Sequence, residues 1–148
     1  MTFQLLVLLH TLSATIWTGG HLILAVMVLP RALRKKAPNL IENFEENFET
    51  LGLISLGLQV LTGLGLIWIY FPHFEGLWAL DSFLSRYVVT KLGLLLLTVT
   101  LAIHARLFII PKLSVETLNS LAWHIIAITT IGVLFVVLGV GIRLGGYF

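Results

Sequence analysis

Five histidines are the residues of this 148-residue chain with the clearest chemical potential: His10, His21, His73, His104 and His124. Because the chain has no cysteine and only two methionines, imidazole nitrogen is the main ligand that it can offer to a transition metal. Thiolate metal sites, iron–sulfur clusters, disulfides and covalent c-type haem attachment are excluded for the same reason. The histidines therefore predict metal or haem binding wherever the fold brings them together.

The elements that must position these histidines are long apolar segments. The composition is 58% hydrophobic and 11% charged, with a mean hydropathy of +1.03, which excludes a water-soluble globule. A bilayer core needs roughly 20 apolar residues in a helix, and such stretches run approximately over residues 3–29, 51–71, 87–110 and 121–142. The predicted fold is an all-α integral membrane protein, a four-transmembrane-helix bundle that forms a single domain over residues 1–148.

Charged residues between the spans predict the orientation. A basic cluster lies at residues 31–36 and Lys112 follows the third span, so the positive-inside rule places both connections in the cytoplasm and both termini outside it. The basic excess thus reports orientation in a membrane, which we expect to be a bacterial inner membrane, and not a nucleic-acid partner. Over residues 39–50, apolar residues at helical spacing alternate with glutamates, which predicts an amphipathic cytoplasmic helix or an extension of the second span.

Four of the histidines fall inside predicted spans, where ionisable residues are costly and are usually functional. His10 and His21 are eleven residues apart, which puts them on one face of the first span, with Trp17 between them and about 16 Å of rise separating the two imidazoles. Counting helical rise puts His21, His104 and His124 at one depth in the cytoplasmic half. A b-type haem takes axial histidines from facing helices, so we expect His21, with His104 or His124, to ligate an inner haem.

His10 is expected to belong to an outer haem or substrate site. Its candidate neighbours are Lys91, at nearly the same depth, and His73 in the external loop. Gln59, inside the second span, must find a partner within the protein, either at a helix–helix contact or on the second nitrogen of a ligating histidine. Lys91 and Arg106 lie toward opposite ends of the third span, where each could pair with haem propionates or anchor the helix at the interface.

Two stretches of the chain resemble the copper resistance D-like (CopD) membrane superfamily. They comprise His10, Trp17, Gly19-Gly20 and Pro30-Arg31 in the first span, and Lys91-Leu92, His104-Ala105-Arg106 and Pro111 in the third. The HemJ-type protoporphyrinogen oxidases, four-helix proteins that bind b haem, are partially similar through His10, Trp17 and Lys91. The resemblance implies a four-helix bundle with His10 and Lys91 at the positions of the common motif.

Three functions follow as hypotheses. The first is a membrane-embedded b-type haem protein for electron transfer, with one or two haems and a quinol or periplasmic electron carrier as redox partner. The second is a copper-binding or copper-transport protein with a three-histidine inner site of His21, His104 and His124. The third is a HemJ-like haem-dependent oxidase, for which the sequence singles out no catalytic residue. The oligomeric state, including a homo-oligomer, stays open. The candidate cofactor-binding residues are His10, Trp17, His21, Gln59, Lys91, His104, Arg106 and His124.

Overall fold

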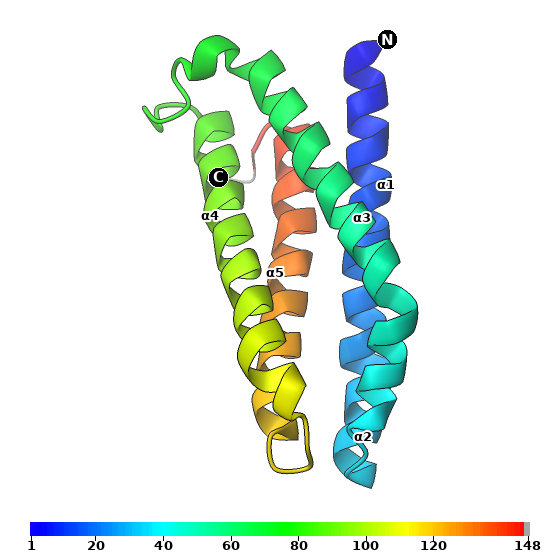
Figure 1. The fold of residues 1–148 in the computed structure, drawn as a ribbon. Helices are drawn as coiled ribbons and strands as arrows, with labels where there is room; N and C mark the ends of the chain where they lie inside the picture. The colour runs from blue at the N-terminus through cyan, green and yellow to red at the C-terminus, as the bar shows by residue number, and fades with distance from the viewer. Residues whose placement is uncertain (147–148) are drawn as a thin grey trace.

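The computed structural model describes residues 1–146, which are largely helical and contain no strand. The main helices are α1 (Thr2–Ile23), α2 (Leu29–Lys35), α3 (Asn39–Tyr70), α4 (Phe83–His104) and α5 (Leu118–Leu144) (Figure 1). With the short helical segments that continue α1 and α4, four helical stretches are long and apolar enough to cross a membrane: Thr2–Lys35, Asn39–Tyr70, Phe83–Lys112 and Leu118–Leu144. The predicted all-α architecture with four transmembrane helices is confirmed.

The helices extend beyond the predicted spans. The segment at residues 39–50 is the first part of α3 and not a separate amphipathic helix, so the extension of the second span is the correct alternative. The break between helices falls before residue 39, in the connection from α2 to α3. Lys36 ends α2 in a left-handed conformation with φ 51°, and Pro38 caps α3 directly afterwards. No further residue that breaks a helix follows until Phe71, where φ and ψ leave the helical region.

Two π-helical segments widen the first and third spans, at Leu24–Val28 and Ala105–Ile109. Each begins six residues before a proline, Pro30 or Pro111. A proline lacks a backbone N–H, and its ring crowds the carbonyl of the residue four positions earlier. In both spans that residue is the central one of the π segment. The wider turn accommodates that carbonyl. Pro111 therefore reshapes the helix at a histidine, because the second π segment begins directly after His104.

The packing order leaves a seam on one side of the bundle. Helix α1 packs against α3 and α5, and α4 packs against α5, whereas α3 and α4 do not pack closely against each other in the described residues (Figure 1). Apolar clusters close the bundle at its two ends. Their buried members include Leu24, Leu29, Ile41, Ile109 and Leu121 at one end and Ile67, Phe71, Leu77 and Val88 at the other. The middle of the seam is left for cavities.

The start of α1 and the end of α5 lie at the same end of the bundle as the loop between α3 and α4 (Figure 1). The connections at residues 36–38 and 113–117 lie at the opposite end. This arrangement gathers the basic cluster at residues 31–36 and Lys112 at one end, as the orientation prediction requires. The location of the two termini outside the cytoplasm stays a prediction.

Candidate functional site

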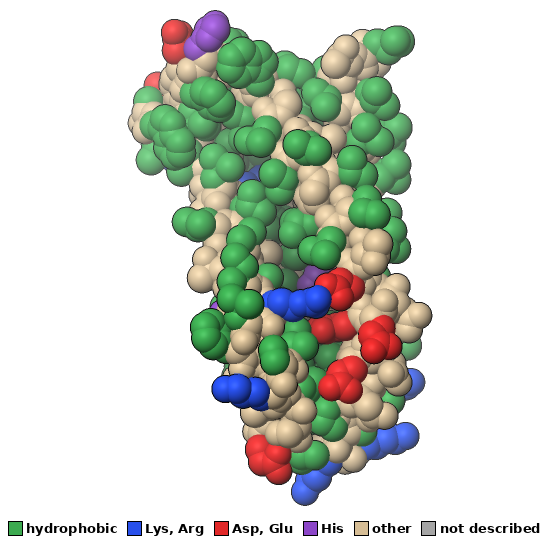
Figure 2. All heavy atoms as spheres, in the orientation of Figure 1, with side chains coloured by type: hydrophobic (Ala, Val, Ile, Leu, Met, Phe, Trp, Pro, Cys, Tyr) green, Lys and Arg blue, Asp and Glu red, His purple; other side chains and the backbone are tan. Residues whose placement is uncertain are grey.

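Two cavities lie along the seam between α3 and α4, and Figure 2 shows the hollow on this face of the molecule. The cavity nearer the start of α1, which is the outer one in the predicted orientation, has a volume of about 530 Å³, and its polar lining includes His10, Gln59, Lys91 and Arg143. The inner cavity has a volume of about 580 Å³, and its polar lining includes His21, Glu45, Glu49, Arg106 and His124. The side chains of Trp17 and Leu56 line both cavities and therefore form the partition between them.

His10 in the outer cavity is held by a threonine of α3. Its Nδ1 lies 3.0 Å from Thr62 Oγ1, and the Thr62 hydroxyl donates its hydrogen to the Leu58 carbonyl at 2.6 Å. Because that hydroxyl has one hydrogen, it accepts the hydrogen bond from His10 Nδ1. His10 Nε2 therefore keeps its lone pair. From the sequence, Gln59 is a candidate partner for a histidine nitrogen. Its Oε1 is buried and has no hydrogen-bond partner in residues 1–146.

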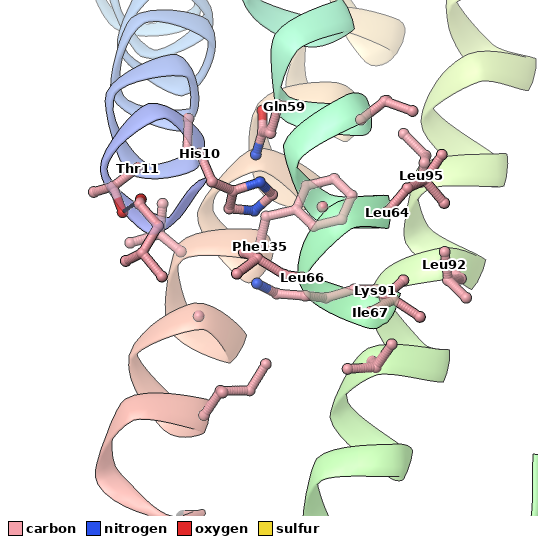
Figure 3. A pocket seen from close by; sticks show the side chains of 18 of the residues that line it. His10, Thr11, Gln59, Leu64, Leu66, Ile67, Lys91, Leu92, Leu95 and Phe135 are labelled. Atoms are coloured by element: carbon pink, nitrogen blue, oxygen red, sulfur yellow. Dashed lines mark hydrogen bonds between the residues drawn. The ribbon is translucent and has the colours of Figure 1, made fainter. Parts of the chain in front are cut away.

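Two glycines make room for the polar side chains of this cavity. A Cβ atom at Gly63 would lie 3.2 Å from His10 Cε1, and one at Gly139 would lie 3.3 Å from Lys91 Nζ. Figure 3 shows His10 and Lys91 pointing into the same space from α1 and α4. Of the two predicted neighbours of His10, Lys91 thus shares its cavity. His73 does not line the cavity and lies exposed in the loop, where its ring centroid is 5.3 Å from that of Trp68.

His21 in the inner cavity is fixed by its own helix. Its Nδ1 lies 2.9 Å from the Trp17 carbonyl oxygen, which can only accept, so Nδ1 carries the hydrogen and Nε2 keeps its lone pair. The ring also packs against Trp17 at a centroid distance of 4.4 Å and against the edge of Phe48 at 6.4 Å. The Thr129 hydroxyl, from α5, lies 3.2 Å from the His21 carbonyl oxygen and ties the two helices together at this level.

His104 and His124 form a pair between α4 and α5. His104 Nδ1 lies 3.0 Å from His124 Nε2, and the rings are nearly parallel, with an interplanar angle of 7° and centroids 5.0 Å apart. His124 Nδ1 donates to the Ser120 carbonyl at 3.0 Å, so the hydrogen between the rings belongs to His104. His124 is half-buried and lines the inner cavity. His104 is exposed beside Phe108, contrary to the expectation that it faces the interior.

The pair has the spacing of two ligands of one ion. Two nitrogens at about 2.0–2.1 Å from a tetrahedral metal are about 3.3 Å apart, close to the observed 3.0 Å. Within residues 1–146, however, no group of three or more histidine, aspartate or glutamate side chains is placed to hold a metal ion. The structure therefore brings together two of the three residues of the expected histidine site, and His21 remains apart from them on α1.

Acidic residues that line the inner cavity were not anticipated as part of a site. Arg106 Nη1 lies 2.7 Å from Glu49 Oε1, so Arg106, the candidate partner of a propionate, already has a carboxylate partner in the protein. Glu45 lines the cavity one turn earlier on the same face of α3. Figure 2 shows acidic side chains gathered beside a basic one at this level. The i, i+4 spacing of the two glutamates could have indicated a shared face, but not that this face borders the cavity.

One comparison with known proteins identifies a family. A family model described as copper resistance protein D (CopD) matches residues 42–142, which cover most of α3, all of α4 and most of α5. The matched range includes Lys91 and His104-Ala105-Arg106, whereas the motif around His10 and Trp17 lies before it. No curated protein and no solved structure matches the chain.

Proposed function

Because the chain belongs to the copper resistance protein D (CopD) family, we propose that this integral membrane protein binds copper and that His104 and His124 hold the ion. The observation that carries the proposal is the 3.0 Å separation of His104 Nδ1 and His124 Nε2. Imidazole is a suitable copper ligand. The bond from His124 Nδ1 to the Ser120 carbonyl is the kind of support that orients metal-binding histidines and fixes their tautomer.

The hydrogen between the two rings lies where the ion would be held. Copper binding therefore displaces this hydrogen, and a neutral His104 then carries its hydrogen on Nε2. Because protons and copper compete for the same nitrogens, we expect the copper affinity to fall as the pH is lowered. His104 lies on the outer surface of the helices, about two helical turns from the Lys112 end of its span.

Elemental analysis of the purified protein tests the proposal. We expect about one copper ion per chain after dialysis against copper-free buffer, and loss of that ion in the double variant His104→Ala/His124→Ala. His73→Ala is the matched control, because His73 is exposed in a loop outside both cavities. Retention of copper by the double variant would falsify the assignment.

A second candidate function, haem binding, is favoured by the inner cavity. Its volume of about 580 Å³ far exceeds the space of one ion and lies in the usual range for organic ligands. A bound haem would supply one-electron chemistry. His21 offers the Nε2 lone pair for an axial bond, and Arg106 at the same cavity offers a guanidinium to a propionate in exchange for Glu49. Electron transfer between the membrane and a redox partner depends on this second candidate.

An optical spectrum separates the two candidates. Protein from cells that make haem should give a b-type band in the reduced-minus-oxidised spectrum, and His21→Ala should remove the band while the copper content stays unchanged. His73→Ala again serves as control. A protein that carries copper and shows no haem band would exclude the second candidate and leave the first intact.

A further inference from the structure

The outer cavity has a charge imbalance that the copper proposal does not use. Its charged lining residues, Lys91 and Arg143, are both basic, and no aspartate or glutamate is among the described residues that line it. We propose that this cavity binds a long-chain carboxylate from the bilayer, with the acid group at Lys91 and the chain along the seam between α3 and α4. The proposal is independent of copper or haem at the inner level.

The position of Lys91 is the first support. It lies eight residues after the start of α4, about 12 Å along the helix from its outer end. Its side chain is largely covered and extends across the cavity toward His10 (Figure 3), with Nζ in the space left by Gly139. No carboxylate of residues 1–146 lies within ion-pair distance of it. An ammonium group in such apolar surroundings is strongly favoured by an anionic partner.

The surroundings of Lys91 fit the two ends of an amphiphile. Arg143 follows Gly139 by four residues, so it lies one helical turn nearer the outer end on the same face of α5, where it attracts anions to the mouth of the cavity. The remaining walls are mostly apolar side chains. They include Val7, Leu64, Ile67, Leu92, Leu95 and Phe135. Because the cavity lies in the seam between α3 and α4, an alkyl chain can enter from the lipid.

The depth of Lys91 distinguishes a single-chain carboxylate from a bilayer phospholipid. Phospholipid phosphates stay at the membrane interface, whereas Lys91 lies about two helical turns inside α4. A fatty acid has a small acid group on one chain and can place that group next to the ammonium. One carboxylate also balances the single charge of Lys91, and the charge-assisted hydrogen bond between them is of the strong kind.

Binding of radiolabelled palmitate to the purified protein in neutral detergent tests the proposal. We expect saturable binding that hexadecanol, the uncharged analogue of the same chain length, does not displace. Lys91→Met, which keeps an unbranched side chain one atom shorter and removes its charge, should weaken palmitate binding at least about tenfold. Lys91→Arg should restore part of the affinity. Lys112→Met, at the other end of the same span and outside the cavity, is the matched control.

Three results would overturn the proposal. Unchanged palmitate affinity in a folded Lys91→Met variant would show that the ammonium does not bind the acid group. If hexadecanol displaces labelled palmitate as well as unlabelled palmitate does, the cavity is an apolar groove that does not recognise the acid group. If phosphatidylglycerol does so, the cavity is a phospholipid site. The two competition experiments use the unmodified chain, so they decide the question even if the variant fails to fold. A loss of copper in the wild-type protein would leave the palmitate result unaffected.

Discussion

At the residue scale, every histidine of the membrane spans uses its Nδ1 for a contact inside the protein. His10 donates to Thr62, His21 and His124 donate to backbone carbonyls four residues earlier, and His104 donates to His124. These bonds fix the tautomers and leave Nε2 of His10 and His21 with a lone pair. A metal or hydrogen-bonded ligand at either cavity would therefore meet a preset nitrogen, with no proton shift within the ring.

The hydrogen bond that His10 donates to Thr62 gives a stability prediction. Thr62→Val keeps the shape of the side chain but leaves the half-buried Nδ1–H of His10 without an acceptor, which we expect to cost about 1–3 kcal/mol of unfolding free energy. Thermal unfolding in detergent, followed by loss of the monodisperse gel-filtration peak, measures the effect. Thr100→Val is the control, because Thr100 is exposed and its hydroxyl bonds only to its own helix at Leu96. Equal melting temperatures of Thr62→Val and Thr100→Val would contradict the prediction.

The ion pair of Arg106 and Glu49 gives a second prediction at this scale. Their side chains are 58% and 38% exposed, and Arg106 lies within about two helical turns of the Lys112 end of its span, where long charged side chains reach the interface. Because solvent screens an ion pair there, Arg106→Gln should cost less than about 1 kcal/mol. The same melting measurement, repeated at low and high salt, checks this. If haem occupies the inner cavity, the same substitution should lower haem retention much more than it lowers stability. A large loss of stability in the haem-free protein would show that the pair is structurally essential.

At the element scale, small residues and prolines set how close the helices lie and where their side chains point. Phe48 of α3 packs into the space left by Gly20 of α1, and its ring edge meets His21. The sequence allowed prediction of four apolar spans and of different levels for His10 and His21, because these depend on composition and helical rise alone. It did not reveal that His104 is exposed. That outcome depends on how α4 rotates against α5, which no pattern in either helix determines.

Adjacent glycines of α1 allow a controlled test of this packing. A Cβ atom at Gly20 would overlap the Phe48 ring, whereas one at Gly19 would have nothing within 4 Å. We expect Gly20→Ala to destabilise the protein by about 1–3 kcal/mol through overpacking, and Gly19→Ala to be neutral or slightly stabilising because alanine favours a helix. Melting of the two variants side by side measures the difference. Because Phe48 lines the inner cavity, Gly20→Ala should also weaken any ligand bound there.

At the scale of the whole molecule, the up-and-down order of the helices puts the outer and inner cavities at different depths of the membrane. The candidate sites could be only partly predicted from the sequence. Residue spacing predicts histidines at two levels of the bundle, and it gives Lys91 as a candidate neighbour of His10. Thr62, Glu45 and Glu49 were not assigned to sites, because their roles depend on the face that α3 turns toward α1 and α4. Backbone acceptors such as the Ser120 carbonyl carry no signal in the sequence.

The orientation of the bundle is testable with fusions. The basic residues at one end predict that both termini lie outside the cytoplasm. Alkaline phosphatase fused after Phe148 should therefore be active in a bacterial host, whereas a fluorescent protein that folds only in the cytoplasm should stay dark at the same position. Fusions at Lys36 should give the reverse pattern. A fluorescent C-terminal fusion would show that the bundle is inserted the other way round.

The partition of Trp17 and Leu56 has an electrical consequence. Trp17 is 4% exposed, and both side chains stand between the two cavities. A charge that crosses a membrane at 100 mV gains or loses roughly 2.3 kcal/mol, so an open passage through the bundle would dissipate the voltage of the cell. Trp17 and Leu56 are the side chains that line both cavities, so a charge that moved from one cavity to the other would have to pass them. The bundle thus holds two ligand-sized spaces at different levels, with one tryptophan and one leucine side chain between them.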